Sequence, residues 1–152
     1  MNHEGMVHAL EEICRILKPG GILIDIHPVP EGYLIKAIQG DRILFAERKR
    51  ETSSEDVLRA EDALAESVER DIFTVDRRAE FDFLTYAASV RELRDYWEEL
   101  NAFEDDPKDE ALIEREEDLF AQVEEIMRAS GAGAEVAIHE RVRIARLRPV
   151  SC

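Results

Sequence analysis

Residues 7–28 constrain the fold more than any other part of the 152-residue chain. The apolar residues of their first half have the spacing of one buried helix face, namely Val7, Leu10, Ile13, Cys14, Ile16 and Leu17. Pro19 cannot continue that helix, and Gly20-Gly21 gives the backbone freedom to turn. Residues 22–26 are then almost entirely apolar, which is typical of a strand covered on both faces. The segment therefore predicts a helix-to-strand half of an α/β unit.

Further along the chain, the spacing of the apolar residues changes between the period of a strand and that of a helix. It predicts strands over 33–38, 42–47, 72–86 and 135–147. It predicts helices near 5–17, 53–70, 89–101 and 109–129. The first two of these strands surround Gln39-Gly40-Asp41, so we expect them to form a hairpin. The predicted fold class is α/β, a small mixed sheet with flanking helices in a single domain over 1–152.

Details of several elements can also be predicted. The 72–86 strand alternates apolar and polar residues, so one face should be buried, with Arg77 interrupting that face at a bulge or bend. The closing strand should place Val136, Ile138, Val142 and Ile144 on one face. Two helices should begin with capping boxes, formed by Thr52 with Glu55 and by Ser89 with Glu92.

The net charge of −15 at pH 7 argues against a nucleic acid or an anionic membrane as a partner, because both would be repelled. Eleven acidic residues lie between 104 and 125. They alternate with a regular apolar stripe, so a solvated helix face explains them, and an acidic docking surface is the alternative. No apolar run of about 18 residues is present, and the start of the chain does not resemble a secretory signal. We therefore expect a cytoplasmic protein.

The chain has two cysteines, Cys14 and Cys152. Cys14 lies on the apolar stripe of the first helix, where a small buried hydrophobic residue is expected. A structural disulfide would require Cys14 to meet the last residue of the chain, and no pattern in the sequence indicates this.

The segment LEEICRILKPGGILIDIHP, residues 10–28, resembles the lead into the fifth sheet strand of class I S-adenosylmethionine-dependent methyltransferases, of the type 11-like kind. The matching positions are Glu11 or Glu12, Arg15, Leu17, Lys18, Pro19, Gly20 and Gly21. The resemblance implies a Rossmann-like arrangement in which the 135–147 strand lies between the 22–26 and 72–86 strands, antiparallel to the first.

In this family S-adenosylmethionine binds in the first half of the fold, on a glycine-rich loop after the first strand and an acidic residue ending the second. Residues 1–6 leave no room for either feature. The chain therefore resembles the C-terminal half of a methyltransferase without the cofactor-binding half, and we assign it no cofactor-binding residue.

The loop after the 22–26 strand is the best candidate for a binding site, because open α/β sheets bind ligands beyond the carboxyl ends of their strands. His27 and Glu31 lie in the loop that follows this end of the strand, and Tyr33 lies two residues after Glu31. The resemblance implies that the region faces a methyl acceptor, with His27 as a base or polar anchor and Glu31 orienting the acceptor. The alternative is a polar loop in which His27 only ends the strand. Asp25 needs a hydrogen-bond partner if it is buried.

Other kinds of site have little support in the sequence. The four histidines lack the spacing of zinc ligands, and no catalytic or metal residue is assigned. Arg141 and Arg143 could bind an anion, but cross-strand pairing with Asp76, Glu80 or Asp82 is the simpler interpretation.

Two functions remain open. The chain is a methyltransferase by descent, with its cofactor half supplied by a partner chain or an upstream coding region, or it is a non-catalytic binding or dimerisation module. The 22–26 strand would have an open edge in either case, and open edges favour association. We therefore expect a homodimer through this edge, or a partner that supplies the missing half.

Overall fold

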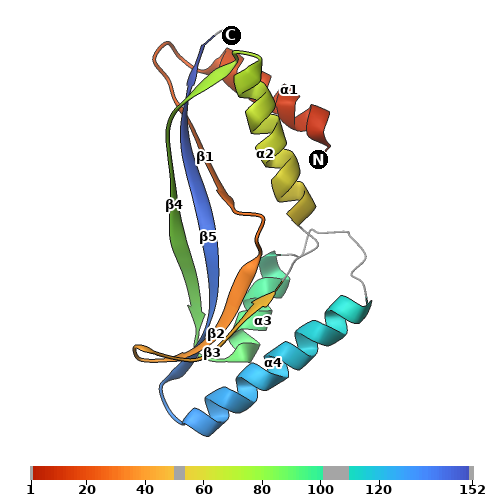
Figure 1. The fold of residues 1–152 in the computed structure, drawn as a ribbon, viewed down its shortest axis with the longest axis vertical. Helices are drawn as coiled ribbons and strands as arrows, with labels where there is room; N and C mark the ends of the chain where they lie inside the picture. Colours follow the sequence, from red (N-terminus) through yellow and green to blue (C-terminus); the bar gives the residue numbers. More distant parts are fainter. Residues whose placement is uncertain (1, 50–53, 101–109, 151–152) are drawn as a thin grey trace. The chain divides into compact units, whose positions relative to one another are not determined.

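The computed structural model describes residues 2–49, 54–100 and 110–150 (Figure 1). Its helices are α1 (His3–Ile16), α2 (Ser54–Glu69), α3 (Val90–Leu100) and α4 (Glu110–Ser130). Its strands are β1 (Leu23–Pro28), β2 (Tyr33–Gln39), β3 (Arg42–Lys49), β4 (Phe73–Ala87) and β5 (Ala134–Pro149). Every predicted helix and strand is present, and the ends agree with the predicted ones to within two residues.

The last strand, β5, pairs with three other strands. It is antiparallel to β1 from Leu23↔Leu147 to Pro28↔Val142. It is antiparallel to β2 over residues 134–139, and β2 forms the predicted hairpin with β3. It also pairs with β4, so it lies between β1 and β4 as predicted (Figure 1).

The direction of β4 follows from its ion pairs with β5. These are Asp76 with Arg146 and Arg148, and Glu80 with Arg141 and Arg143. Because the partner numbers fall as the β4 numbers rise, the two strands are antiparallel. All the strand pairs are therefore antiparallel, and the prediction of a mixed sheet is wrong. The strands that would be parallel, β1 and β4, are separated by β5 and do not pair with each other.

β4 differs from its prediction in a second respect. All its residues from Thr74 to Phe83 are exposed, so neither face is buried there. Only its ends reach a core, through Phe73 and Ala87. Asp76 pairs with even-numbered arginines of β5 and Glu80 with odd-numbered ones, so the β4–β5 pairing is irregular between these two residues. The bulge or bend predicted at Arg77 stays a prediction.

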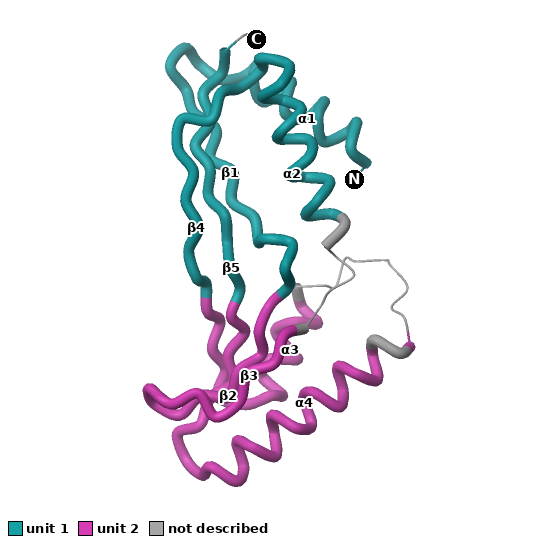
Figure 2. The backbone as a smooth tube through the Cα atoms, viewed as in Figure 1, with its two compact units in different colours: residues 1–32, 50–83, 140–152 teal, residues 33–49, 84–139 magenta. Residues whose placement is uncertain are grey.

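The chain forms two compact units (Figure 2). Unit 1 comprises residues 1–32, 50–83 and 140–152, and its core lies between α1, α2 and the strands. The buried residues of this core are Cys14, Ile72, Phe73, Ala145 and Leu147, and those packed against it are Leu10, Ile13, Leu17, Leu23, Leu64 and Val68. The apolar stripe predicted for the first helix is therefore confirmed, except that Ile16 is 67% exposed.

Unit 2 comprises residues 33–49 and 84–139, and its core lies between α3, α4 and the strands. Its buried members include Tyr33, Ile35, Ala37, Val90, Leu93, Phe120, Val123, Val136 and Ile138. The Tyr33 and Trp97 rings pack at a centroid distance of 5.1 Å. The capping box at α3 is confirmed at Ser89, whose hydroxyl accepts a hydrogen bond from the Glu92 N–H at 3.1 Å. The other predicted capping box, Thr52 with Glu55, lies outside the described side chains.

The apolar cores of the two units include different sets of β5 side chains, although Ala137 and Val142 are buried as well. Val136 and Ile138, both even-numbered, belong to the core of unit 2. In unit 1 the core residues are odd-numbered, Ala145 and Leu147. Of the four residues predicted to form one apolar face, Val136, Ile138 and Val142 are buried, and the prediction is wrong for Ile144, which belongs to neither core.

Cys14 is buried as predicted, with 2% of its surface exposed, but it is disulfide-bonded. Its Sγ lies 3.6 Å from the carbonyl oxygen of Ile72. The other cysteine, Cys152, lies outside the described residues. A disulfide at Cys14 contradicts the expectation that no disulfide forms.

Helices α1 and α2 of unit 1 are joined by ion pairs on their exposed sides. His3 Nε2 lies 2.8 Å from Glu66 Oε2, and Arg70 of unit 1 pairs with both Glu66 and Glu11. The hydrogen bond with Glu66 raises the pKa of the His3 imidazole above its ordinary 6.5. The same bond lowers the pKa of the Glu66 carboxyl below its ordinary 4.5.

Across the described residues, no helix combines the length and the apolar character needed to cross a membrane.

We predict that Ile35→Ala destabilises unit 2 by about 2–5 kcal/mol, because it leaves a cavity at a fully buried position. The matched control is Ile43→Ala on the neighbouring strand, where the side chain is 60% exposed and the effect should be under about 1 kcal/mol. Urea unfolding followed by hydrogen exchange would measure both. Equal effects for the two variants would contradict the described core.

The His3–Glu66 contact predicts a pH-dependent stability. The raised His3 pKa contributes stability below pH 6.5 that is lost as the pH rises through the folded-state value. The lowered Glu66 pKa contributes stability above pH 4.5 that is lost as the pH falls through its folded-state value. His3→Gln should therefore lower the Tm by on the order of 1–2 °C between these two pH values, and less above them.

Thermal unfolding from pH 4 to pH 8 would measure this difference, with His8→Gln as the control on the same helix. His8 is 72% exposed, and its contact with Glu11 is longer, at 3.5 Å. A difference for His3→Gln that does not change with pH would show that the contact with Glu66 is not responsible.

Candidate functional site

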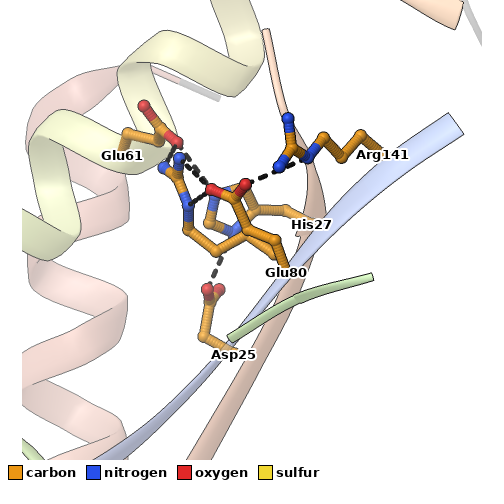
Figure 3. Close-up of polar contacts among 6 residues, drawn as sticks. Asp25, His27, Glu61, Glu80 and Arg141 are labelled. Atoms are coloured by element: carbon orange, nitrogen blue, oxygen red, sulfur yellow. Dashed lines mark hydrogen bonds and ion pairs between the residues drawn. The ribbon is translucent and has the colours of Figure 1, made fainter. Parts of the chain in front are cut away.

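A cluster of charged side chains lies on the face of the unit 1 sheet beneath α2 (Figure 3). Three of its members come from neighbouring strands: His27 from β1, Arg143 from β5 and Glu80 from β4. His27 and Arg143 are directly opposite each other in the β1–β5 register, so their side chains share a face. Glu61 of α2 contacts the cluster from the helix, and Asp25 lies two residues before His27 on the same face of β1.

His27 is held between two carboxylates. Its Nδ1 lies 2.7 Å from Asp25 Oδ2, and its Nε2 lies 3.4 Å from Glu61 Oε1 (Figure 3). The side chain is only 12% exposed. A neutral imidazole has one N–H and can donate to only one of these carboxylates, whereas an imidazolium can donate to both. The two contacts therefore fix the orientation of the ring.

Arg143 joins the helix to the sheet. Its guanidinium group pairs with Glu61 of α2 and with Glu80 of β4, the latter at 2.8 Å. The hydrogen bond with Glu80 raises the pKa of the Arg143 guanidinium, and the same bond lowers the pKa of the Glu80 carboxyl. Arg141 also contacts Glu80, at 3.1 Å, but its side chain is 57% exposed. Arg143 is thus the central cation of the cluster.

The cluster has three carboxylates, two guanidinium groups and one imidazole, so its charges balance when both ring nitrogens of His27 carry protons. This arrangement limits what the ring can do. To accept a proton from a ligand, Nε2 of His27 would need Glu61 to move aside. As described, the cluster is an internally satisfied ion-pair network that connects α2 to three strands.

The three residues predicted for a binding site have different environments. His27 belongs to the cluster, while Glu31 is exposed and its charge helps to raise the pKa of Arg143. Tyr33 belongs to unit 2, where it is 2% exposed and packs against Trp97. His27 and Glu31 are therefore near the same arginine in unit 1, and Tyr33 has the packing of a core residue.

Some members of the cluster could be predicted from the sequence and one was missed. Of the three acids predicted as possible partners of Arg141 and Arg143, Glu80 is confirmed, whereas Asp76 pairs with Arg146 and Arg148. Asp25 has the hydrogen-bond partner that its position required. Glu61 is the member that was missed, although it lies four residues after Val57 and three before Leu64. That spacing placed it on the inward stripe.

Among the residues that the structure describes, no group of three or more histidine, cysteine, aspartate or glutamate side chains is placed to hold a metal ion. Comparison with family models, with curated proteins and with solved structures found no match to this chain.

We predict that Arg143→Ala destabilises unit 1, because it leaves the Glu61 and Glu80 carboxylates without their shared cation. Removing one partner of a fully buried pair costs about 3–5 kcal/mol, and Arg143 is 21% exposed, so we expect about 1–3 kcal/mol. Arg141→Ala is the matched control, because it removes an exposed cation from the same Glu80 and should have a smaller effect. Chemical unfolding would compare them, and an equal loss of stability in both variants would contradict a central role for Arg143.

Proposed function

We propose that this chain is a methyltransferase-like scaffold that does not transfer methyl groups as an isolated polypeptide. The observation that supports this proposal is the strand order. Helix α1 leads through the LKPGG turn into β1, and β5 lies antiparallel between β1 and β4. This is the order that the resemblance to class I S-adenosylmethionine-dependent methyltransferases implies for the C-terminal half of the fold.

Two features argue against catalysis by these residues alone. The 152 residues contain no glycine-rich loop of the kind that holds S-adenosylmethionine in the family. The histidine that would act on an acceptor, His27, has both ring nitrogens directed at carboxylates of its own chain. In this proposal the cluster stabilises the position of α2 on the sheet, and His27 is a structural residue.

We expect calorimetric titration of the purified chain with S-adenosylhomocysteine to give no binding heat at ligand concentrations up to about 1 mM, which excludes affinities stronger than about 1 mM. The same titration of an active S-adenosylmethionine-dependent methyltransferase provides the control. Stoichiometric binding with micromolar affinity would contradict the proposal and would justify a search for a methyl acceptor.

The second candidate function is a binding or dimerisation module built on the same scaffold. It is favoured by the open edge of β1, which pairs only with β5 among the described residues. This candidate function requires no cofactor. It predicts that the mass of the protein in solution rises toward that of a dimer as its concentration increases.

We propose the cytoplasm as the location of the chain, and only the sequence patterns described above support this. The disulfide at Cys14 weighs against it, because such bonds form and persist mainly in oxidising compartments. Comparison of the intact mass before and after reduction, in protein purified without reductant, would show whether the bond forms.

A further inference from the structure

The outer edge of β1 carries no paired strand in the part of the chain that the structure describes. β1 pairs with β5 on one side and with no other strand. An edge of this kind presents unpaired N–H and C=O groups in the geometry that another strand requires. β1 also lacks the charges that usually protect such an edge, because Asp25 is its single acidic residue and that carboxylate is bound to His27.

The backbone groups that point outward from this edge can be identified. Val29, directly after β1, donates its N–H to the carbonyl oxygen of Arg141 of β5 at 2.8 Å. In an antiparallel pair the residues that bond to a given neighbour alternate along the strand. Leu23, Asp25 and His27 therefore direct their backbone groups to β5. The residues between them, and Ile22 before the strand, direct theirs outward.

The side chains of the outward-directed residues are also exposed. Ile22 is 42% exposed, Ile24 44% and Ile26 58%. The same three isoleucines therefore supply both unpaired backbone groups and uncovered apolar surface. The next residue in the series, Pro28, has no N–H and limits the usable edge to residues 22–26.

We propose that this edge pairs with the same edge of a second copy of the chain, about a two-fold axis at Ile24. In this register Ile24 lies opposite Ile24 of the second copy, and Ile22 lies opposite Ile26. All three are hydrogen-bonded pairs, and each such pair exchanges two backbone hydrogen bonds. The three isoleucines of each copy meet on one face of the joined sheet.

The neighbouring two-fold registers are less favourable. A register centred on Asp25 opposes two like charges and places Pro28, which has no donor, opposite Ile22. A register centred on Ile26 places Pro28 opposite Ile24. In the register centred on Ile24, Asp25 lies opposite Leu23, so no like charges are opposed. Of these three registers, the one centred on Ile24 is therefore the most complementary.

The dimer should be weak. Three half-exposed isoleucines give a few hundred Å² of apolar surface per copy, against about 800 Å² per partner in standard stable interfaces. The charge of −15 on each copy adds repulsion, which salt reduces. We therefore expect a dissociation constant on the order of 10–100 µM that becomes smaller as the salt concentration rises.

Sedimentation equilibrium of the full chain from about 1 to about 500 µM tests the proposal. The mass should rise from 17.4 kDa toward twice that value. Ile24→Pro removes an outward N–H and no bond to β5, so it should weaken the dimer at least tenfold while unit 1 stays folded by circular dichroism. Ile43→Lys, at an exposed isoleucine of β3, should leave the dissociation constant unchanged.

A pair of charge variants tests the register and does not depend on the tolerance of β1 for proline. Ile24→Lys and Ile24→Glu should each be monomeric, because each places like charges opposite one another. An equimolar mixture of the two should form a heterodimer, because residue 24 then faces its opposite charge. The corresponding mixture of Ile26→Lys and Ile26→Glu should not recover the dimer, since residue 26 faces Ile22.

A monomeric mass at 500 µM would overturn the proposal, and so would a dimer that both Ile24→Pro and Ile24→Lys leave unchanged. Recovery by the residue 26 mixture and not by the residue 24 mixture would also overturn the register. The inference deepens the second candidate function and does not rest on a methyltransferase relationship. The dimer proposal is therefore tested independently of the S-adenosylhomocysteine titration, and neither result decides the other.

Discussion

The backbone pairing of β5 is the interaction on which the rest of the structure depends. Its residues 134–139 pair with β2 in unit 2, and its residues 142–147 pair with β1 in unit 1. It also pairs with β4. Its contacts with β1 and β2 join residues more than 90 positions apart, so before β5 arrives β1 has no strand partner in the described sheet and β2 has only β3. Such non-local pairing is slow to form, because the loop must close before the contacts stabilise it.

Unit 1 shows how apolar and charged contacts divide one sheet face. Leu23 lies opposite Leu147 in the core beneath the helices, and four residues along β1 His27 lies opposite Arg143 in the charged cluster. Burial of the apolar pair stabilises the unit without specifying direction. The charged network adds little net stability, because its members lose hydration, but it requires particular partners. The network therefore positions α2 on the sheet, and both ring nitrogens of His27 contact its carboxylates.

Much of the architecture could be predicted from local sequence patterns. Helix and strand positions follow from the spacing of apolar residues, because each period buries one face. The pairing of Glu80 with Arg143 could be predicted because both lie on strands expected to be neighbours. Glu61 was missed because a helix stripe indicates which side faces inward but not which strand residue it meets. The disulfide at Cys14 was missed for the same reason, since distance along the sequence says nothing of distance in space.

By itself the sequence determined the elements of this protein and the order in which they occur, since periodicity, capping and glycine turns are local properties of a chain. Its prediction that the 22–26 strand is covered on both faces is wrong, because Ile22, Ile24 and Ile26 are 42%, 44% and 58% exposed. Only the tertiary structure decided that β4 is exposed on both faces and that β1 keeps an open edge. Burial and pairing are properties of what surrounds a residue, and those surroundings are supplied by segments distant in the chain.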